Sequence, residues 1–372
     1  MRRSHSDAVN RKLDHIRICL EKNVEPPTTT WFEEVTLIHK ALPEVDLDEI
    51  NTSVEFLGKK LSAPIIVSSM TGGHRVSEGI NRTIAKVVEE LGLGMGVGSQ
   101  RVAIENPELE HTFRVVRKIA PSALIMGNIG FAQLLRDDFI DIVKRAIDMI
   151  DADAIIVHLN PLQEVIQPEG DTKFRGLLER LKELVSRIEV PVVVKEIGCG
   201  ISKEVAKALE ECGVHAIDVS GAGGTSFAII EKYRLEGDKT MQTIADTFKT
   251  WGIPTALSLC EVRYATSLPL IASGGIRTGI DIAKAIALGA DIAGIALPVL
   301  RAYYSEGERG IRELLGRLIM ELRICMLLLG VKELKELKYV PIVLSQKFKN
   351  YLEQRRIKYT SEIRRRGLYT HS

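Results

Sequence analysis

The sequence predicts an α/β fold, a (β/α)₈ TIM barrel with an N-terminal extension and C-terminal helices. Between about residues 63 and 300, short runs rich in Val, Ile and Ala alternate with charged stretches of helical period. The apolar runs show little alternation of polar and apolar residues, as is typical of parallel strands covered on both faces. Eight such units in succession favour a closed barrel over an open doubly wound sheet.

The eight expected strands lie at residues 63–70, 93–99, 123–130, 152–160, 191–198, 214–221, 268–276 and 290–298. Helical patterns separate them, for example at residues 81–91, 174–188 and 202–212. The Gly-rich stretch 92–98 is no dinucleotide fingerprint, because Val97 and Ser99 occupy the third-glycine position in its two registers. We therefore expect residues 1–372 to form one domain, with an extension over 1–62, the barrel over about 63–300, and helices with a basic tail over 301–372.

Composition narrows the possible partners. Lys and Arg number 50 against 49 Asp and Glu, and aromatic residues make up 5%, so neither nucleic acid nor a membrane surface is expected as a partner. The five cysteines are scattered without a C-x-x-C pair, which fits reduced thiols in a cytoplasmic protein. Charges within the apolar segment 311–331 predict an amphipathic helix instead of a membrane span. The basic tail from Arg355 to Arg366 is expected to be a solvated end.

Polar residues recur where the expected strands end, which is where the active sites of (β/α)₈ barrels lie. These strand ends are Ser68 to Gly73, Gly98 to Arg101, Gly127-Asn128, His158 to Asn160, Lys195-Glu196, Ser220 to Thr225, Ser273 to Arg277 and Ala296-Leu297. The glycines after the sixth and seventh strands leave room for backbone N–H groups to approach a phosphate, although paired glycines are also ordinary turn residues.

Three side chains near these ends are candidates for chemistry. Lys195 follows an apolar strand, so it is interpreted as a cation beside an anionic cofactor ring, as a Schiff-base lysine, or as a lysine that reaches solvent or pairs with Glu196. His158 heads the most polar cluster and could be a core histidine, a ligand or a base. Glu164 is the best Mg²⁺ candidate, since Mg²⁺ is often held by one carboxylate with substrate oxygens, but it could equally cap a loop.

Two basic clusters could bind an anion. Arg11, Lys12 and His15 would share one face of a helix in the extension, although such residues are usually just solvated. Arg101, beside Ser99 at a strand end, is the stronger candidate.

Together these motifs resemble the type II, FMN-dependent isopentenyl-diphosphate delta-isomerases, in one register from about residue 6 to beyond residue 330. The motifs are Arg11-Lys12-x-x-His15, Met70-Thr71-Gly72-Gly73, Gly98-Ser99-Gln100-Arg101, His158 to Glu164, Lys195-Glu196, Gly221 to Thr225 and Ser273 to Arg277. The resemblance implies an isomerase of isoprenoid biosynthesis that interconverts isopentenyl and dimethylallyl diphosphate. It also implies reduced FMN as acid/base cofactor, Mg²⁺, NAD(P)H as reductant, and a homo-oligomer, either a tetramer or an octamer.

The resemblance also assigns roles to residues. Those implied to contact FMN are Ser68, Ser69, Met70, Thr71, Ser99, Asn128, Lys195, Ser220, Thr225, Gly275, Ile276, Arg277, Ala296 and Leu297. Those implied to contact the substrate are Arg11, Lys12, Ser99, Gln100, Arg101, His158 and Gln163. Gln163, His158 and Lys195 are the implied catalytic residues, and Glu164 is the implied Mg²⁺ ligand.

Two alternatives remain open. The FMN-dependent 2-hydroxy-acid oxidases and dehydrogenases share the fold, and fold alone does not choose between the activities. Those enzymes carry a catalytic His and a carboxylate-binding Arg in the sixth-strand loop, where this chain has Ala222 and Thr225. A flavin-binding scaffold without activity is the second alternative, which the polar strand ends disfavour.

Overall fold

The computed structural model describes residues 5–367 and confirms the (β/α)₈ barrel. Eight parallel strands close in the order β10-β11-β4-β5-β6-β7-β8-β9. They are β4 (Ile65–Val67), β5 (Gly94–Gly96), β6 (Leu124–Gly130), β7 (Ala154–His158), β8 (Val192–Lys195), β9 (Ala216–Asp218), β10 (Leu270–Ala272) and β11 (Ile292–Ile295). Each strand lies within its predicted range, because buried Val, Ile and Ala runs of this kind suit a sheet covered on both faces.

A hairpin that the sequence pattern did not indicate closes the N-terminal end of the barrel. Its strands are β2 (Val54–Phe56) and β3 (Lys59–Leu61), joined through Leu57 and Gly58, both at positive φ. Such a two-residue turn matches the right-handed twist of the paired strands. Phe56 and Leu61 pack into the apolar cluster formed by residues at the starts of the barrel strands. The opposite, C-terminal end is therefore the one available for a site.

Helices surround the barrel, and the predicted segments are helical. The outer helices are α2 (Arg75–Leu91), α4 (His111–Ile119), α5 (Phe139–Ile150), α7 (Leu177–Arg187), α8 (Lys203–Glu211), α11 (Thr255–Ala265), α12 (Gly279–Ala287) and α13 (Leu297–Leu329). Shorter helices occupy loops at the C-terminal end, namely α3 (Arg101–Glu105), α6 (Pro161–Ile166), α9 (Phe227–Arg234) and α10 (Lys239–Thr247). α13 is kinked at Glu306 and Gly307. Within residues 5–367, none of the helices has the length and apolar character needed to cross a membrane.

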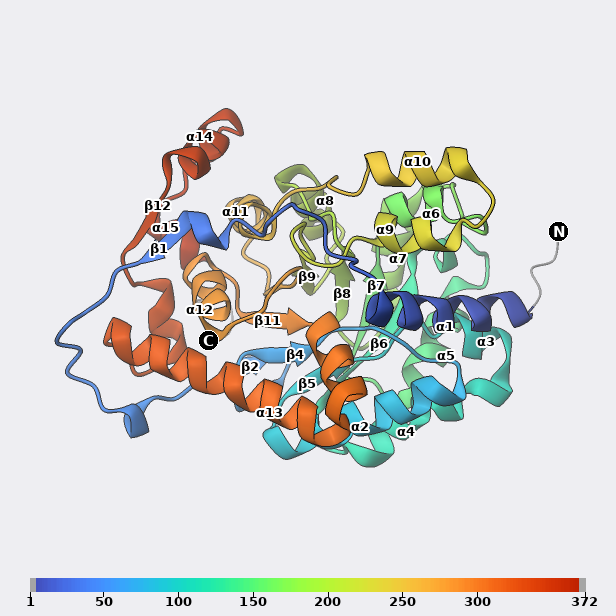
Figure 1. The fold of residues 1–372 in the computed structure, drawn as a ribbon, viewed down its shortest axis with the longest axis horizontal. Helices are drawn as coiled ribbons and strands as arrows, with labels where there is room; N and C mark the ends of the chain where they lie inside the picture. The colour runs from blue at the N-terminus through green and yellow to red at the C-terminus, as the bar shows by residue number, and fades with distance from the viewer. Residues whose placement is uncertain (1–4, 368–372) are drawn as a thin grey trace.

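The described parts of the N-terminal extension and of the C-terminal segment pack against the rest of the protein. Helix α1 (His5–Glu21) lies on the side toward which the arrows of β4 and β11 point (Figure 1). Farther along, β1 (Val35–Leu37) pairs antiparallel with β12 (Ile342–Leu344), so a two-stranded sheet joins the N-terminal extension to the C-terminal segment.

The expectation of a solvated basic tail was wrong for two of its arginines. Arg364, in α15 (Ser361–Arg364), is 6% exposed and donates hydrogen bonds to the carbonyl oxygens of Ala287 and Val340. Arg355, which follows α14 (Gln346–Gln354), pairs with the buried Glu261. Because a buried carbonyl or carboxylate needs a hydrogen-bond partner, these arginines are part of the folded structure.

Candidate active site

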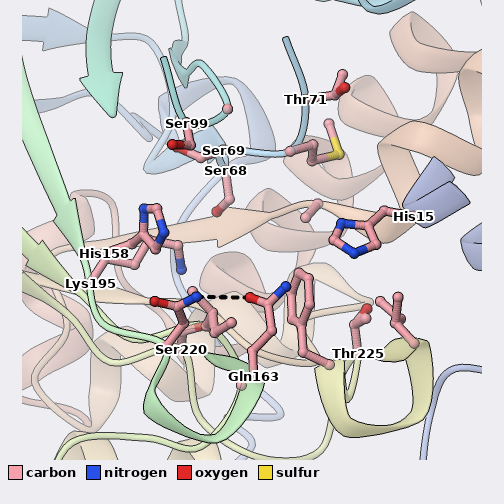
Figure 2. Close-up of a pocket in the computed structure, with 18 of the residues that line it drawn as sticks. His15, Ser68, Ser69, Thr71, Ser99, His158, Gln163, Lys195, Ser220 and Thr225 are labelled. Atoms are coloured by element: carbon pink, nitrogen blue, oxygen red, sulfur yellow. Dashed lines mark hydrogen bonds between the residues drawn. The ribbon is translucent and has the colours of Figure 1, made fainter. Parts of the chain in front are cut away.

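A cavity of about 250 Å³ lies at the C-terminal ends of the barrel strands, covered by α1 and the start of α13. Figure 2 shows His15 on one side of it, His158 and Lys195 on the opposite side, and Gln163 between them. Most of the predicted site residues line this cavity: Arg11, Lys12, Ser68, Ser69, Met70, Thr71, Ser99, Arg101, Asn128, His158, Gln163, Glu164, Lys195, Ser220, Thr225, Gly275, Arg277, Ala296 and Leu297.

Two predicted site residues do not line the cavity. The side chain of Gln100 is completely buried. Its Nε2 donates to the Ala146 carbonyl at 2.8 Å, and its Oε1 accepts from the backbone N–H of Asn128 at 2.9 Å. Gln100 thus joins β6 to α5 and has no side-chain group directed at the cavity. Ile276 is 1% exposed and belongs to the main apolar core. Sequence position alone did not distinguish these inward-packed side chains from their cavity-lining neighbours.

Lys195 forms an ion pair at the floor of the cavity. Its Nζ lies 3.1 Å from Asp218 Oδ2 and 3.1 Å from Ser273 Oγ, and Ser273 Oγ donates to Asp218 Oδ1 at 2.6 Å. Asp218 is the residue opposite Lys195 in the pairing of β8 with β9. This arrangement fixes the Lys195 ammonium at the floor of the cavity, beside the Asp218 carboxylate, and leaves Glu196 out of the pair. The sequence analysis missed Asp218, although a lone carboxylate at the end of an apolar strand was a usable signal.

His158 is held in one orientation by a short chain of hydrogen bonds. Its Nδ1 lies 2.8 Å from Asn128 Oδ1, and Asn128 Nδ2 donates to Ser69 Oγ at 2.9 Å. Nδ1 therefore carries the proton, and Nε2 is the other ring nitrogen. Burial, and then the positive charges of Lys195 and Lys12, lower the pKa of His158 to about 4. The imidazole is consequently neutral near pH 7.

Helix α1 places Arg11, Lys12 and His15 over the cavity. Their helical spacing predicted a shared face but not this position. Lys12 Nζ donates to the Ser99 carbonyl at 2.7 Å and lies 5.3 Å from the centre of the Phe113 ring. Arg11 lies beside it, with its guanidinium 3.6 Å from Glu169. Burial, together with the charge of Arg11, lowers the pKa of Lys12 to about 7. These cations are therefore not simply solvated.

A fully buried carboxylate, Glu231 in α9, links α1 to Gln163. His15 Nε2 lies 2.9 Å from Glu231 Oε1, and Gln163 Nε2 donates to the same oxygen at 2.8 Å. Arg234 binds the other carboxylate oxygen. Burial alone would raise the pKa of Glu231, but the contacts with His15 and Arg234 outweigh it and lower the pKa to about 2. The sequence analysis missed Glu231, since an acidic residue within a short helix carries no distinctive signal.

Asn160 organises the polar side of the cavity. Its Nδ2 donates to Gln163 Oε1 at 3.0 Å, the dashed bond that ends on Gln163 in Figure 2, and to Glu164 Oε1 at 3.0 Å. The amide of Asp171 donates to the other oxygen of Glu164. Among residues 11–367, no three His, Cys, Asp or Glu side chains gather closely enough to hold a metal ion by themselves. A metal at Glu164 would need most of its ligands from substrate and water.

The loops after β9 and β10 form a glycine-lined edge of the cavity. Gly223, Gly274 and Gly275 have φ values of 111°, 96° and 79°, where residues with a Cβ are strained. A Cβ on Gly275 would lie 2.5 Å from the Gly223 carbonyl oxygen, so the loops approach as closely as only glycine permits. Nearby, the buried hydroxyl of Ser68 lines the cavity and has no hydrogen-bond partner. These features fit a phosphate-bearing cofactor at this edge.

Fold and site together define a barrel of the FMN-dependent type with a cation-lined cavity. The family model described as FMN-dependent dehydrogenase matches residues 163–342. Isopentenyl-diphosphate delta-isomerase from Ignicoccus hospitalis is 51% identical over 338 residues, covering 90% of this chain and 93% of that one. The same enzyme from Pyrococcus abyssi is 50% identical over 352 residues, covering 93% and 95%. The chain belongs to the isopentenyl-diphosphate delta-isomerase family.

Solved structures similar to the barrel share its fold. A mandelate oxidase is 20% identical with a TM-score of 0.61, covering 92% of this chain and 98% of that one. At this level of identity the likeness concerns the fold alone, and activity has to be argued from the site.

Proposed function

We propose that this protein interconverts isopentenyl diphosphate and dimethylallyl diphosphate, with reduced FMN, Mg²⁺ at Glu164, and NAD(P)H as the source of electrons. Family membership supports the reaction. The observation that carries the proposal is the position of α1, which brings Arg11 and Lys12 over the same cavity that has Lys195 at its floor. Cations on two sides of the cavity suit two anions: a diphosphate beside Arg11 and Lys12, and an anionic cofactor ring beside Lys195.

The described residues fit FMN as the cofactor. The glycine-rich edge would accept the FMN phosphate. The rest of FMN would contact the cavity-lining residues at the ends of β4, β5, β6, β9 and β11. When bound and reduced, the flavin supplies a negative charge near the substrate and a ring nitrogen able to carry a proton. Lys195, fixed by Asp218 and Ser273, would stabilise that negative charge.

The other side chains divide between holding and orienting the substrate. Arg11, Lys12, Ser99 and Arg101 would hold the diphosphate, whereas Gln100 is excluded because its side chain is buried elsewhere. His158 would donate to the diphosphate from Nε2 only after taking up a proton there, which the negative charge of the bound diphosphate would favour.

Gln163 would orient the hydrocarbon end and relay a proton, because Glu231 and Asn160 fix both ends of its amide. A neutral amide is a weak acid, so we do not assign Gln163 the primary proton donation. Closure by α1 would exclude water from a carbocation-like transition state.

A turnover assay tests the proposal. Isopentenyl diphosphate should be converted after the flavin is reduced by dithionite or NAD(P)H, and the reductant should not be consumed in proportion to product. Isomerisation leaves the oxidation state of the substrate unchanged, so reductant consumed one-for-one would instead identify an oxidoreductase. Absence of conversion by the flavin-loaded, reduced protein would contradict the proposal.

We also propose a cytoplasmic homo-oligomer, a tetramer or an octamer. Exposed Met320, Ile324 and Leu328 follow one another at one-turn spacing along α13, which supports association of copies through an apolar surface. Sedimentation velocity should then give a mass several times that of the 41.2 kDa chain. A monomer at micromolar concentration would contradict this part of the proposal.

A further inference from the structure

The segment between α1 and β1 runs across the two glycine-rich loops. We call residues 22–31 the strap. The Val24 carbonyl accepts from the Ser226 amide at 2.9 Å, and the Thr30 carbonyl accepts from the Ala256 amide at 3.0 Å. Backbone hydrogen bonds at both ends therefore fix the strap to the C-terminal end of the barrel.

The strap also lies in direct contact with the glycines of both loops. A Cβ added to Gly223 would meet the Thr30 amide nitrogen at 2.3 Å, and one added to Gly275 would meet Thr30 Cγ2 at 2.3 Å. The loops that fit a cofactor phosphate on one side thus hold the strap on another. Any displacement of these loops would be transmitted to the strap, because no space separates them.

Glu25 in the strap joins three elements. Its Oε1 accepts from Arg277 Nη2 at 2.5 Å and from Arg277 Nε at 3.2 Å, and its Oε2 lies 3.2 Å from Arg301 Nη1 in α13. Arg301 Nε in turn donates to the carbonyl of Cys19, in the last turns of α1, at 3.4 Å. Glu25 therefore connects the end of α1 with the loop after β10.

Arg277 can hold a second anion without releasing Glu25. A guanidinium has five N–H groups. Nε and Nη2 each donate one N–H to Glu25, and Nη1 donates one N–H to the Ile276 carbonyl at 2.7 Å. The same side chain lines the cavity. The two remaining N–H groups are enough to bind a phosphate oxygen there.

We propose that Glu25 is a positioning residue that holds α1 over the cavity by sharing Arg277 with the cofactor phosphate. The inference rests on the proposed function, which identifies the two anions as FMN and a diphosphate. Sharing has effects of opposite sign on them. Glu25 anchors the helix that carries Arg11 and Lys12, which strengthens diphosphate binding. Glu25 also neutralises part of the Arg277 charge, which weakens the attraction of Arg277 for the FMN phosphate.

The variant Glu25→Gln tests both effects, since it removes the charge and keeps the size. Inorganic pyrophosphate with Mg²⁺ would be titrated calorimetrically into FMN-loaded protein, and FMN and riboflavin would be titrated into apoprotein by flavin fluorescence. We expect the Kd for pyrophosphate and the KM for isopentenyl diphosphate to rise about tenfold, the effect of one lost charge-assisted contact. The Kd for FMN should stay unchanged or fall, and that for riboflavin, which lacks the phosphate, should stay unchanged.

Two further variants provide the controls. Glu21→Gln makes the same charge change at an exposed position at the end of α1 and should leave every constant unchanged. Glu25→Asp keeps the charge and should recover part of the pyrophosphate affinity.

Unchanged pyrophosphate binding by Glu25→Gln would overturn the inference. Weakened binding of pyrophosphate, FMN and riboflavin together would also overturn it, because that result marks a purely structural strap. If wild-type protein bound neither FMN nor pyrophosphate, the proposed function itself would be overturned, and the inference with it.

Discussion

Replacing Glu231 by Gln tests whether one buried carboxylate organises the site. The side chain is fully buried and receives hydrogen bonds from His15, Gln163 and Arg234. A neutral amide of the same size keeps the packing but cannot accept all three, so Gln163 would lose its fixed orientation. Arg234 keeps a second partner, Glu169, at 2.8 Å, which limits the charge left unpaired.

The size of the effect follows from the pKa of Glu231. A fall from 4.5 to about 2 corresponds to roughly 3 kcal/mol of stabilisation at pH 7, at 1.36 kcal/mol per pKa unit. Because the folded-state pKa is the lower one, this stabilisation is complete above the unfolded pKa and is lost as pH falls toward 2. The stability difference between wild type and Glu231→Gln should therefore shrink below about pH 5.

Denaturant unfolding and steady-state kinetics would measure the two consequences. We expect a loss of about 3 kcal/mol in the free energy of unfolding at pH 7. We also expect kcat to fall about ten- to a hundredfold, the cost of one or two charge-assisted hydrogen bonds, with FMN still bound. Glu236→Gln, on the exposed turn after α9, is the matched control. Wild-type kcat and stability in Glu231→Gln would refute the reasoning.

Three further predictions concern the ligands. Glu164→Gln should raise the Mg²⁺ concentration needed for half-maximal activity at least about tenfold at unchanged FMN content, since Glu164 is the one carboxylate among the described residues that line the cavity. An unchanged Mg²⁺ requirement would make Glu164 structural. Lys12 has a pKa of about 7 and loses its charge as pH rises, so kcat/KM should decline above about pH 7. The decline should be absent in Lys12→Arg, and the same decline in both proteins would exclude Lys12 as its cause. Flavin released from the purified protein should be FMN, because the glycine-lined edge of the cavity suits one terminal phosphate and the sequence contains no dinucleotide fingerprint. Chromatography that identified FAD would contradict this.

The barrel and most of the cavity lining could be predicted because their signals are local. A buried parallel strand is a short apolar run, and the residue that follows it marks the active end of the barrel. Lys195, Asn128 and Ser220 were found in this way, and all three line the cavity. Arg11 and Lys12 were found through helical spacing and the family motif together, since a basic turn in an extension is uninformative alone.

The remaining site residues depend on contacts between distant parts of the chain. Glu231 acquires its importance only when α9 meets α1, which brings it within 2.9 Å of His15 across 216 residues of sequence. Glu25 similarly meets Arg277 across 252 residues. The direction of a side chain is equally non-local, because Gln100 follows Ser99 directly and yet packs against α5 instead of facing the cavity. Sequence periodicity reports which face of an element is buried, but not which buried partner it meets.

The electrostatics of the cavity explain why these distant contacts matter together. The pKa values of Arg11, Lys12 and His158 are all lowered, with burial as the largest cause and neighbouring cations as a further one. Holding like charges together in a buried space is unfavourable, so other interactions must maintain the arrangement. Glu231 and Glu25 do so from outside the cluster, because Glu231 fixes α1 at His15 and Glu25 fixes it, through Arg301, at Cys19. An entering diphosphate would relieve the repulsion by bringing negative charge to cations that the fold already holds together, which favours strong anion binding.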